Sequence, residues 1–159
     1  MKKSSIIFLQ VIIVLIGIIA LAILIRLPLT EGRAANLDLF SIYADPFIIY
    51  GYLTSIAFFV ALYQAFELLG HIGRNEVFSR DSVKALRNIK YCAMVLSILI
   101  VLAAIGIRIF HAKDDDPAGF IALSIVASFI SVVVAAAAAV FERTLQSAVD
   151  IKSENDLTV

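Results

Sequence analysis

Four long apolar stretches dominate the hydropathy pattern of the chain. They cover residues 6–27, 47–69, 92–110 and 118–140, with lengths of 22, 23, 19 and 23 residues. An α-helix rises about 1.5 Å per residue, so each stretch can cross a hydrocarbon core about 30 Å thick. Each stretch is apolar on all sides, whereas a soluble core helix needs only one apolar stripe. The pattern predicts an all-α integral membrane protein, a single four-helix bundle domain over residues 1–159.

The composition agrees with lipid as the solvent. Hydrophobic residues make up 62% of the chain and charged residues 16%, with a mean hydropathy of +0.99. Soluble domains carry about 25% charged residues. The longest segments between the spans, 28–46 and 70–91, are too short to bury a core of their own. The single cysteine, Cys92, excludes an intramolecular disulfide and a cysteine-based metal cluster. We therefore expect no separate soluble domain, no metal site and no cofactor.

The distribution of basic residues predicts the orientation in the membrane, because Lys and Arg near short loops face the cytoplasm. Nine of them lie at the N-terminus, in the 70–91 loop and in the C-terminal tail, against four on the other side. An even number of spans places both termini on one side. We expect that side to be the cytoplasm, with the protein in the plasma membrane. Arg26 and Arg108 lie at the outer span ends, where arginine usually reaches toward the headgroups.

Local signals predict where helices begin and end. Asp45-Pro46 and Asp116-Pro117 precede spans two and four. They predict the starts of these helices, because aspartate caps free amide groups and proline suits the first helical position. The two glycines of the 70–73 segment are expected to interrupt the helix of span two. Ser79 is expected to cap a new helix that runs unbroken from Arg80 into span three. The acidic run 114–116 is interpreted as a solvated turn rather than a cation site.

Polar residues near the cytoplasmic ends of the spans form one candidate site. A layer at one depth would consist of Gln10, Gln64, Glu67 and Glu142. Interfacial anchoring and interhelical hydrogen bonds are the simpler interpretation of this layer. The alternative is a cytoplasm-facing ligand site or proton-sensitive element. The absence of charge at mid-depth argues against an ion pump or proton relay.

Span four carries a stripe of small residues. Ser124, Ser128 and Ser131 share one face and are followed by the alanine run 135–139. Small residues let helix backbones approach closely. We interpret this face as packing against another span, with an oligomer contact as the alternative.

The second candidate site is a basic stripe on the helix that leads into span three. Arg80, Lys84, Arg87 and Tyr91 share a face, and apolar residues occupy another side. Such a stripe favours anionic lipid headgroups, or an acidic protein partner. It has no interleaved aromatic residues, so direct nucleic-acid binding is not expected. After span four a helical pattern continues to Ile151, followed by a polar tail that is expected to fray.

Two segments carry a resemblance to a known family. The 77–89 segment reads Val-Phe-Ser-Arg-Asp-Ser-Val-Lys-Ala-Leu-Arg-Asn-Ile and is similar to a family segment with the order Phe-Ser, Asn, Leu-Arg and Ile. The C-terminal signature is Leu145-Gln146 followed by residues 154–159. These residues resemble the bacterial domain of unknown function 2975 family of small four-span membrane proteins. Asp81 stands where asparagine is more usual. The family has no established activity. Its members are often encoded beside a small helix-turn-helix regulator, which implies a bacterial membrane protein that holds or restrains that regulator.

Two functions follow as hypotheses. In the first, the chain is a non-enzymatic regulatory partner whose docking residues are Arg80, Lys84, Arg87, Glu154, Asn155, Asp156 and Leu157. In the second, it is a small transporter or channel that uses the polar layer. An intramembrane enzyme is not expected, because the spans offer no Ser/His or paired-Asp arrangement at depth. Oligomers are possible under either hypothesis.

Overall fold

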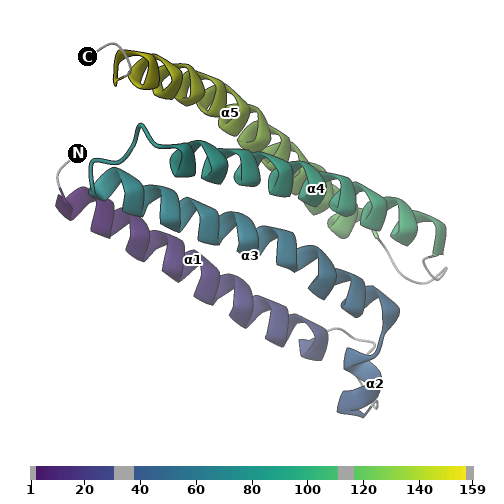
Figure 1. Cartoon of the computed structure of the whole chain (residues 1–159). Coiled ribbons are helices and arrows are strands. Elements are labelled where there is room, and N and C mark those ends of the chain that lie inside the picture. Colours follow the sequence, from purple (N-terminus) through teal and green to yellow (C-terminus); the bar gives the residue numbers. More distant parts are fainter. Residues whose placement is uncertain (1–2, 31–37, 111–116, 157–159) are drawn as a thin grey trace.

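The computed structural model describes residues 3–30, 38–110 and 117–156, and these segments are almost entirely helical. The elements are α1 (Lys3–Thr30), α2 (Leu39–Tyr43), α3 (Pro46–Gly73), α4 (Arg80–Phe110) and α5 (Ala118–Asp156) (Figure 1). Four of them, all but the short α2, are long and apolar enough to cross a membrane. The predicted all-α fold with four spans is therefore confirmed.

The long helices pack in chain order. α1 contacts α3, α3 contacts α4, and α4 contacts α5 most extensively (Figure 1). The start of α1 and the end of α5 lie at the same end of the molecule, as an even number of spans requires. Large apolar side chains remain exposed along the outside of the helices, for example Leu123 at 68% and Phe129 at 69%. This exposure is the arrangement expected where lipid surrounds the helices.

A heptad seam joins α4 to α5. Along each helix the inward positions alternate between spacings of three and four residues, which is the 3.5-residue repeat of a coiled coil. All of them are buried or half-buried: Val83, Leu86, Lys90, Ala93, Ser97, Ile100, Ala104 and Ile107 on α4, and Ser124, Ser128, Ser131, Ala135, Ala138, Glu142, Leu145 and Val149 on α5. Ser97 Oγ and Ser128 Oγ lie 2.8 Å apart across the seam. The prediction that the small-residue face packs against another span is confirmed.

The first predicted span ended at residue 27, but α1 passes through Pro28 and continues to Thr30. Proline has no backbone N–H, so the carbonyl of Leu24, four residues earlier, loses its helical donor. The hydroxyl of Tyr52 on α3 donates to that carbonyl at 3.1 Å. Tyr43 on α2 donates to the next carbonyl, that of Ile25, also at 3.1 Å. The hydroxyl of Tyr52 thus compensates for the proline, because an unsatisfied carbonyl is costly in lipid.

Replacing Tyr52 with phenylalanine is expected to lower the free energy of unfolding by about 1 kcal/mol, the usual net contribution of one such hydrogen bond. In a Pro28→Ala background the new amide can donate to Leu24, so the same replacement should cost less than half as much. Unfolding in mixed micelles measures both values. Equal costs in the two backgrounds would contradict the role assigned to Tyr52.

The end of α3 corrects the interpretation of the glycines. The helix passes through Gly70 and ends at Gly73, which lies against the buried Ile6 of α1. The reversal occurs two residues later, at Asn75, whose φ is 61°. The amide of Asn75 donates to the carbonyl of Ile72 at 3.2 Å, and the amide of Glu76 donates to that of His71 at 2.9 Å. This is a Schellman motif with asparagine in the left-handed position that glycine usually takes.

The helix starts agree with the predicted caps. The Asp45 carboxylate accepts from the amide of Phe47 at 2.8 Å, and Pro46 is the first residue of α3. The Ser79 hydroxyl accepts from the amide of Ser82 at 3.2 Å, and α4 runs unbroken from Arg80 to Phe110. The residues 114–116, including the predicted cap Asp116, lie outside the described residues.

Candidate docking face

α4 and α5 both extend beyond the apolar stretches that would lie in lipid. We call residues 80–91 of α4 and 141–156 of α5 the helical extension. Sixteen helical residues are about 24 Å long, so α5 reaches well past the apolar stretch that ends at Val140. The extension has a core of its own, made by residues that are at most 8% exposed: Ser82, Val83, Ala85, Leu86 and Val149.

Ser82 fixes the start of the extension. It is completely buried, and its hydroxyl donates to the carbonyl of Glu76 at 3.2 Å. Its oxygen also lies 3.0 Å from the hydroxyl of Ser79. These contacts connect the loop after α3 to the first turn of α4. The basic side chains that follow are therefore presented from a defined surface.

The residues of the basic stripe differ in their contacts with the rest of the structure. Arg80 and Lys84 are exposed, as predicted for a docking surface, and the opposite side of the helix is buried. The side chain of Arg87 is 52% exposed, but its Nε donates to Glu142 Oε1 of α5 at 2.7 Å. Arg87 therefore takes part in the contact between α4 and α5, although about half of its side chain stays exposed. The exposed cations of the stripe that lie outside the contact with Glu142 are Arg80 and Lys84.

Glu142 forms an ion cluster with two cations of α4. Its second oxygen accepts from Lys90 Nζ at 2.6 Å, and its side chain is only 10% exposed. Glu142 lies just beyond the apolar stretch of α5, and the hydrogen bonds from Arg87 and then Lys90 lower the pKa of its carboxyl group. Two charge-assisted bonds thus fasten α5 to α4 at the base of the helical extension.

Lys90 was absent from the predicted site because it lies off the face shared by Arg80, Lys84 and Arg87. The heptad spacing along α4 would have placed it on the face that meets α5. On α4 Lys90 lies one heptad step before Ser97, and on α5 Glu142 lies two heptad steps after Ser128, so both side chains belong to the seam. A nearly buried acid at a span end requires a partner, and Lys90 is a cation on the face of α4 that can supply it.

The predicted polar layer is divided between two interfaces. Gln10 of α1 donates to the carbonyl of Phe66 on α3 at 3.4 Å. Glu67 accepts from Tyr63, one turn earlier on the same helix, at 2.8 Å, and Gln64 is half-buried on α3. Glu142 is instead held at the contact between α4 and α5. The structure therefore supports interhelical and local hydrogen bonding for these residues, and it does not gather them around one space.

The C-terminal tail is more helical than expected. Instead of fraying after Ile151, α5 continues to Asp156. Gln146 donates to Asp150 at 2.8 Å, one turn later on the same helix. Among the predicted docking residues, Glu154 and Asn155 are exposed. Leu157 lies outside the described residues.

We expect the ion cluster to make stability depend on pH. The folded-state pKa of Glu142 is depressed, so its contribution is present above the unfolded-state pKa, about 4.3. It is lost as the pH falls through the lower, folded-state value. The melting temperature of the purified chain should therefore fall below pH 5, and Glu142→Gln should reduce that fall. An unchanged pH profile in the variant would contradict this assignment.

Comparison with known proteins places the chain in a family. The model of a protein family of unknown function, DUF2975, matches residues 28–159. The chain belongs to this family. A family relative, the uncharacterized membrane protein YoaS of Bacillus subtilis (strain 168), is 47% identical over 163 residues and the full length of both chains. No solved structure matches the chain. The resemblance noted in the 77–89 and C-terminal segments is thus confirmed, as is the assignment to a membrane.

Proposed function

We propose that this family member is a non-enzymatic regulatory protein of the bacterial plasma membrane. Its helical extension lies in the cytoplasm and docks a small helix-turn-helix regulator. Holding that regulator at the membrane restrains it from acting on DNA. The orientation rests on the excess of basic residues at the end of the molecule where α1 begins and α5 ends.

The observation that carries this proposal is the helical extension itself. It has a buried core, and it is fastened by Glu142, so it forms a rigid surface rather than a loose loop. Arg80 and Lys84 are exposed on this surface and complement an acidic patch on a partner. Glu154 and Asn155 are exposed near the end of α5.

The alternative function, a small transporter or channel, has less support. Its polar layer would need side chains that face a common aqueous path. Gln10 and Glu142 are instead engaged at two different helix contacts, and Glu67 bonds to Tyr63. Docking uses side chains that remain exposed, and it is therefore the better supported function.

Co-purification tests the proposal directly. The tagged chain is extracted in mild detergent together with the regulator encoded beside its gene. We expect the wild type to retain the regulator, and the double charge reversal Arg80→Glu/Lys84→Glu to reduce retention at least about tenfold, the factor that corresponds to 1.4 kcal/mol. Retention should also weaken as salt is raised, because exposed charges are screened.

A matched variant controls for the change of four charge units. Arg74→Glu/Arg143→Glu makes the same change at exposed positions outside the stripe, and it should retain the regulator. Glu142→Gln leaves Arg80 and Lys84 in place but loosens their support, so an intermediate loss is expected. Full retention after charge reversal of the stripe and deletion of residues 150–159 would overturn the docking proposal.

A further inference from the structure

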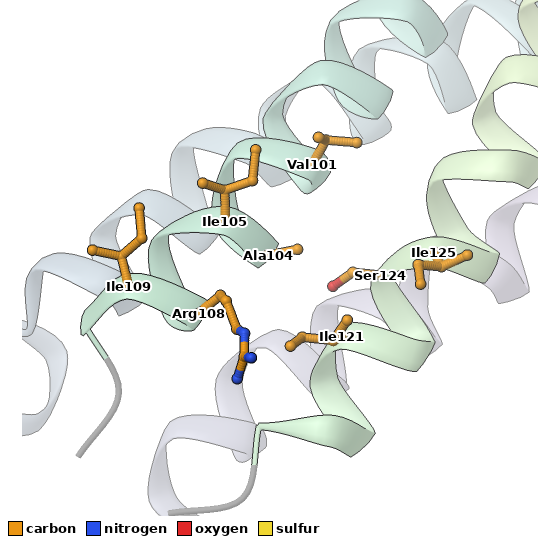
Figure 2. A pocket seen from close by; sticks show the side chains of 8 residues that line it. All are labelled: Val101, Ala104, Ile105, Arg108, Ile109, Ile121, Ser124 and Ile125. Carbon is orange, nitrogen blue, oxygen red and sulfur yellow. The ribbon is translucent and has the colours of Figure 1, made fainter. Parts of the chain in front are cut away.

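A groove opens between α4 and α5 at the end of the seam opposite the ion cluster. Its volume is about 380 Å³, which lies within the 300–1,000 Å³ typical of ligand pockets. The lining is apolar except for one serine and one arginine: Val101, Ala104, Ile105, Arg108, Ile109, Ile121, Ser124 and Ile125 (Figure 2). Both walls come from helices that cross the membrane.

The groove results from the size of the side chains at this end of the seam. Ala104 and Ser124 are the inward residues here, and they are too small to fill the space between the two helices. The larger Ile105, Ile109 and Ile125 stand at the sides, and they are 50%, 66% and 65% exposed. The groove is therefore lined by branched apolar walls and opens toward the surrounding lipid.

Apolar lining disfavours water as the occupant, because water needs two to four polar partners. Hydrocarbon chains are the molecules that surround this surface, and they match its lining. The charged side chain among the lining residues is Arg108, two residues before the end of α4. In Figure 2 its guanidinium group lies at the mouth, near Ile121. This depth is where phospholipid headgroups lie.

We propose that this groove binds one anionic phospholipid. An acyl chain lies along Ala104 and Ser124 between the isoleucines, and the headgroup phosphate accepts hydrogen bonds from Arg108. The planar guanidinium group suits a phosphate in two-pronged geometry. The site is at the opposite end of the molecule from the docking face, so it does not depend on the proposed function.

Native mass spectrometry of the full chain in mild detergent tests this site. The probes are dioleoyl phosphatidylglycerol and dioleoyl phosphatidylcholine, titrated separately. Both phosphates can accept from Arg108, but phosphatidylcholine also carries a quaternary ammonium group, which the guanidinium group repels. We therefore expect phosphatidylglycerol to bind the wild type about tenfold more tightly, a difference of about 1.4 kcal/mol. Arg108→Gln should bring the two lipids within threefold of each other. Arg26→Gln, at the outer end of α1, should keep the wild-type preference.

A second pair of variants tests the groove rather than the charge. Ala104→Leu fills the space and should weaken both lipids, whereas Ala122→Leu, at an exposed position on α5, should weaken neither. Circular dichroism tests whether each variant is folded. If Ala104→Leu is not folded, Ser124→Val is a milder variant that also fills the groove. Equal binding of the two lipids to the wild type, unchanged binding in a folded filled variant, or displacement of the lipid by inorganic phosphate would each overturn the proposal.

Discussion

Replacement of Glu142 by alanine is expected to lower the free energy of unfolding by about 2–3 kcal/mol, because it leaves two cations without their carboxylate. Both oxygens of Glu142 are engaged, one by Arg87 at 2.7 Å and one by Lys90 at 2.6 Å. The side chain of Lys90 is 21% exposed and cannot rehydrate fully in the variant. Unfolding in mixed micelles of detergent and dodecyl sulfate measures this change.

The control for this prediction is Glu67→Ala. Glu67 also lies near the end of a span, but its recorded hydrogen bond is to Tyr63 on its own helix. Pairs of this kind contribute about 0.2–0.5 kcal/mol, so the control should stay close to the wild type. The swap Arg87→Glu/Glu142→Arg should recover part of the lost stability. A loss in Glu142→Ala no larger than in Glu67→Ala would show that the cluster does not fasten α5 to α4.

Overpacking the seam should give the second large effect. Ala138 is 5% exposed and lies at a heptad position against α4. Ala138→Leu adds three carbons where the backbones are close, and it is expected to cost about 1–3 kcal/mol. Its neighbour Ala137 is exposed on the lipid side, so Ala137→Leu should be nearly neutral. The same unfolding measurement distinguishes the two positions.

The two alanine variants share one residue type and one chemical change, and they are adjacent in sequence. Their difference therefore reports the direction that each side chain faces. Equal losses in Ala137→Leu and Ala138→Leu would contradict the heptad register. A larger loss in Ala137→Leu would indicate that the outer face of α5 contacts a second copy, which is the oligomer alternative for the small-residue stripe.

Much of the fold could be predicted from the sequence, because lipid imposes simple rules. Apolar length located the four spans, the Asp45-Pro46 and Ser79 signals located two helix starts, and small residues identified the packing face of α5. Each of these features depends on a residue and its immediate neighbours along the helix. The basic stripe was predicted for the same reason, since its 3.6-residue periodicity is a local property.

The features that sequence reasoning missed depend on contacts between helices. The first predicted span ended at Leu27, but α1 continues through Pro28 because the hydroxyl of Tyr52 compensates for the carbonyl of Leu24 that the proline leaves without a donor. Glu142 was assigned to a polar layer because its depth could be estimated, whereas its partners depend on the register of α4 against α5. The end of α3 was misplaced since the residue in the left-handed conformation is Asn75 rather than a glycine.

The helical extension connects these findings to the proposed function. Its rigidity comes from Ser82 and Glu142, and its exposed charge comes from Arg80 and Lys84. It can bind a cytosolic regulator only if it faces the cytoplasm. The orientation of this end of the molecule is therefore the central claim of the account.

Cysteine accessibility in intact cells tests this orientation most directly. In a Cys92→Ala background, Asp81→Cys and Asp150→Cys place thiols on the helical extension, and Ser41→Cys places one at the opposite end, on α2. We predict that a membrane-impermeant maleimide labels Ser41→Cys in intact cells, and the other two only after the membrane is permeabilised. Labelling of Asp81→Cys or Asp150→Cys in intact cells would contradict the account.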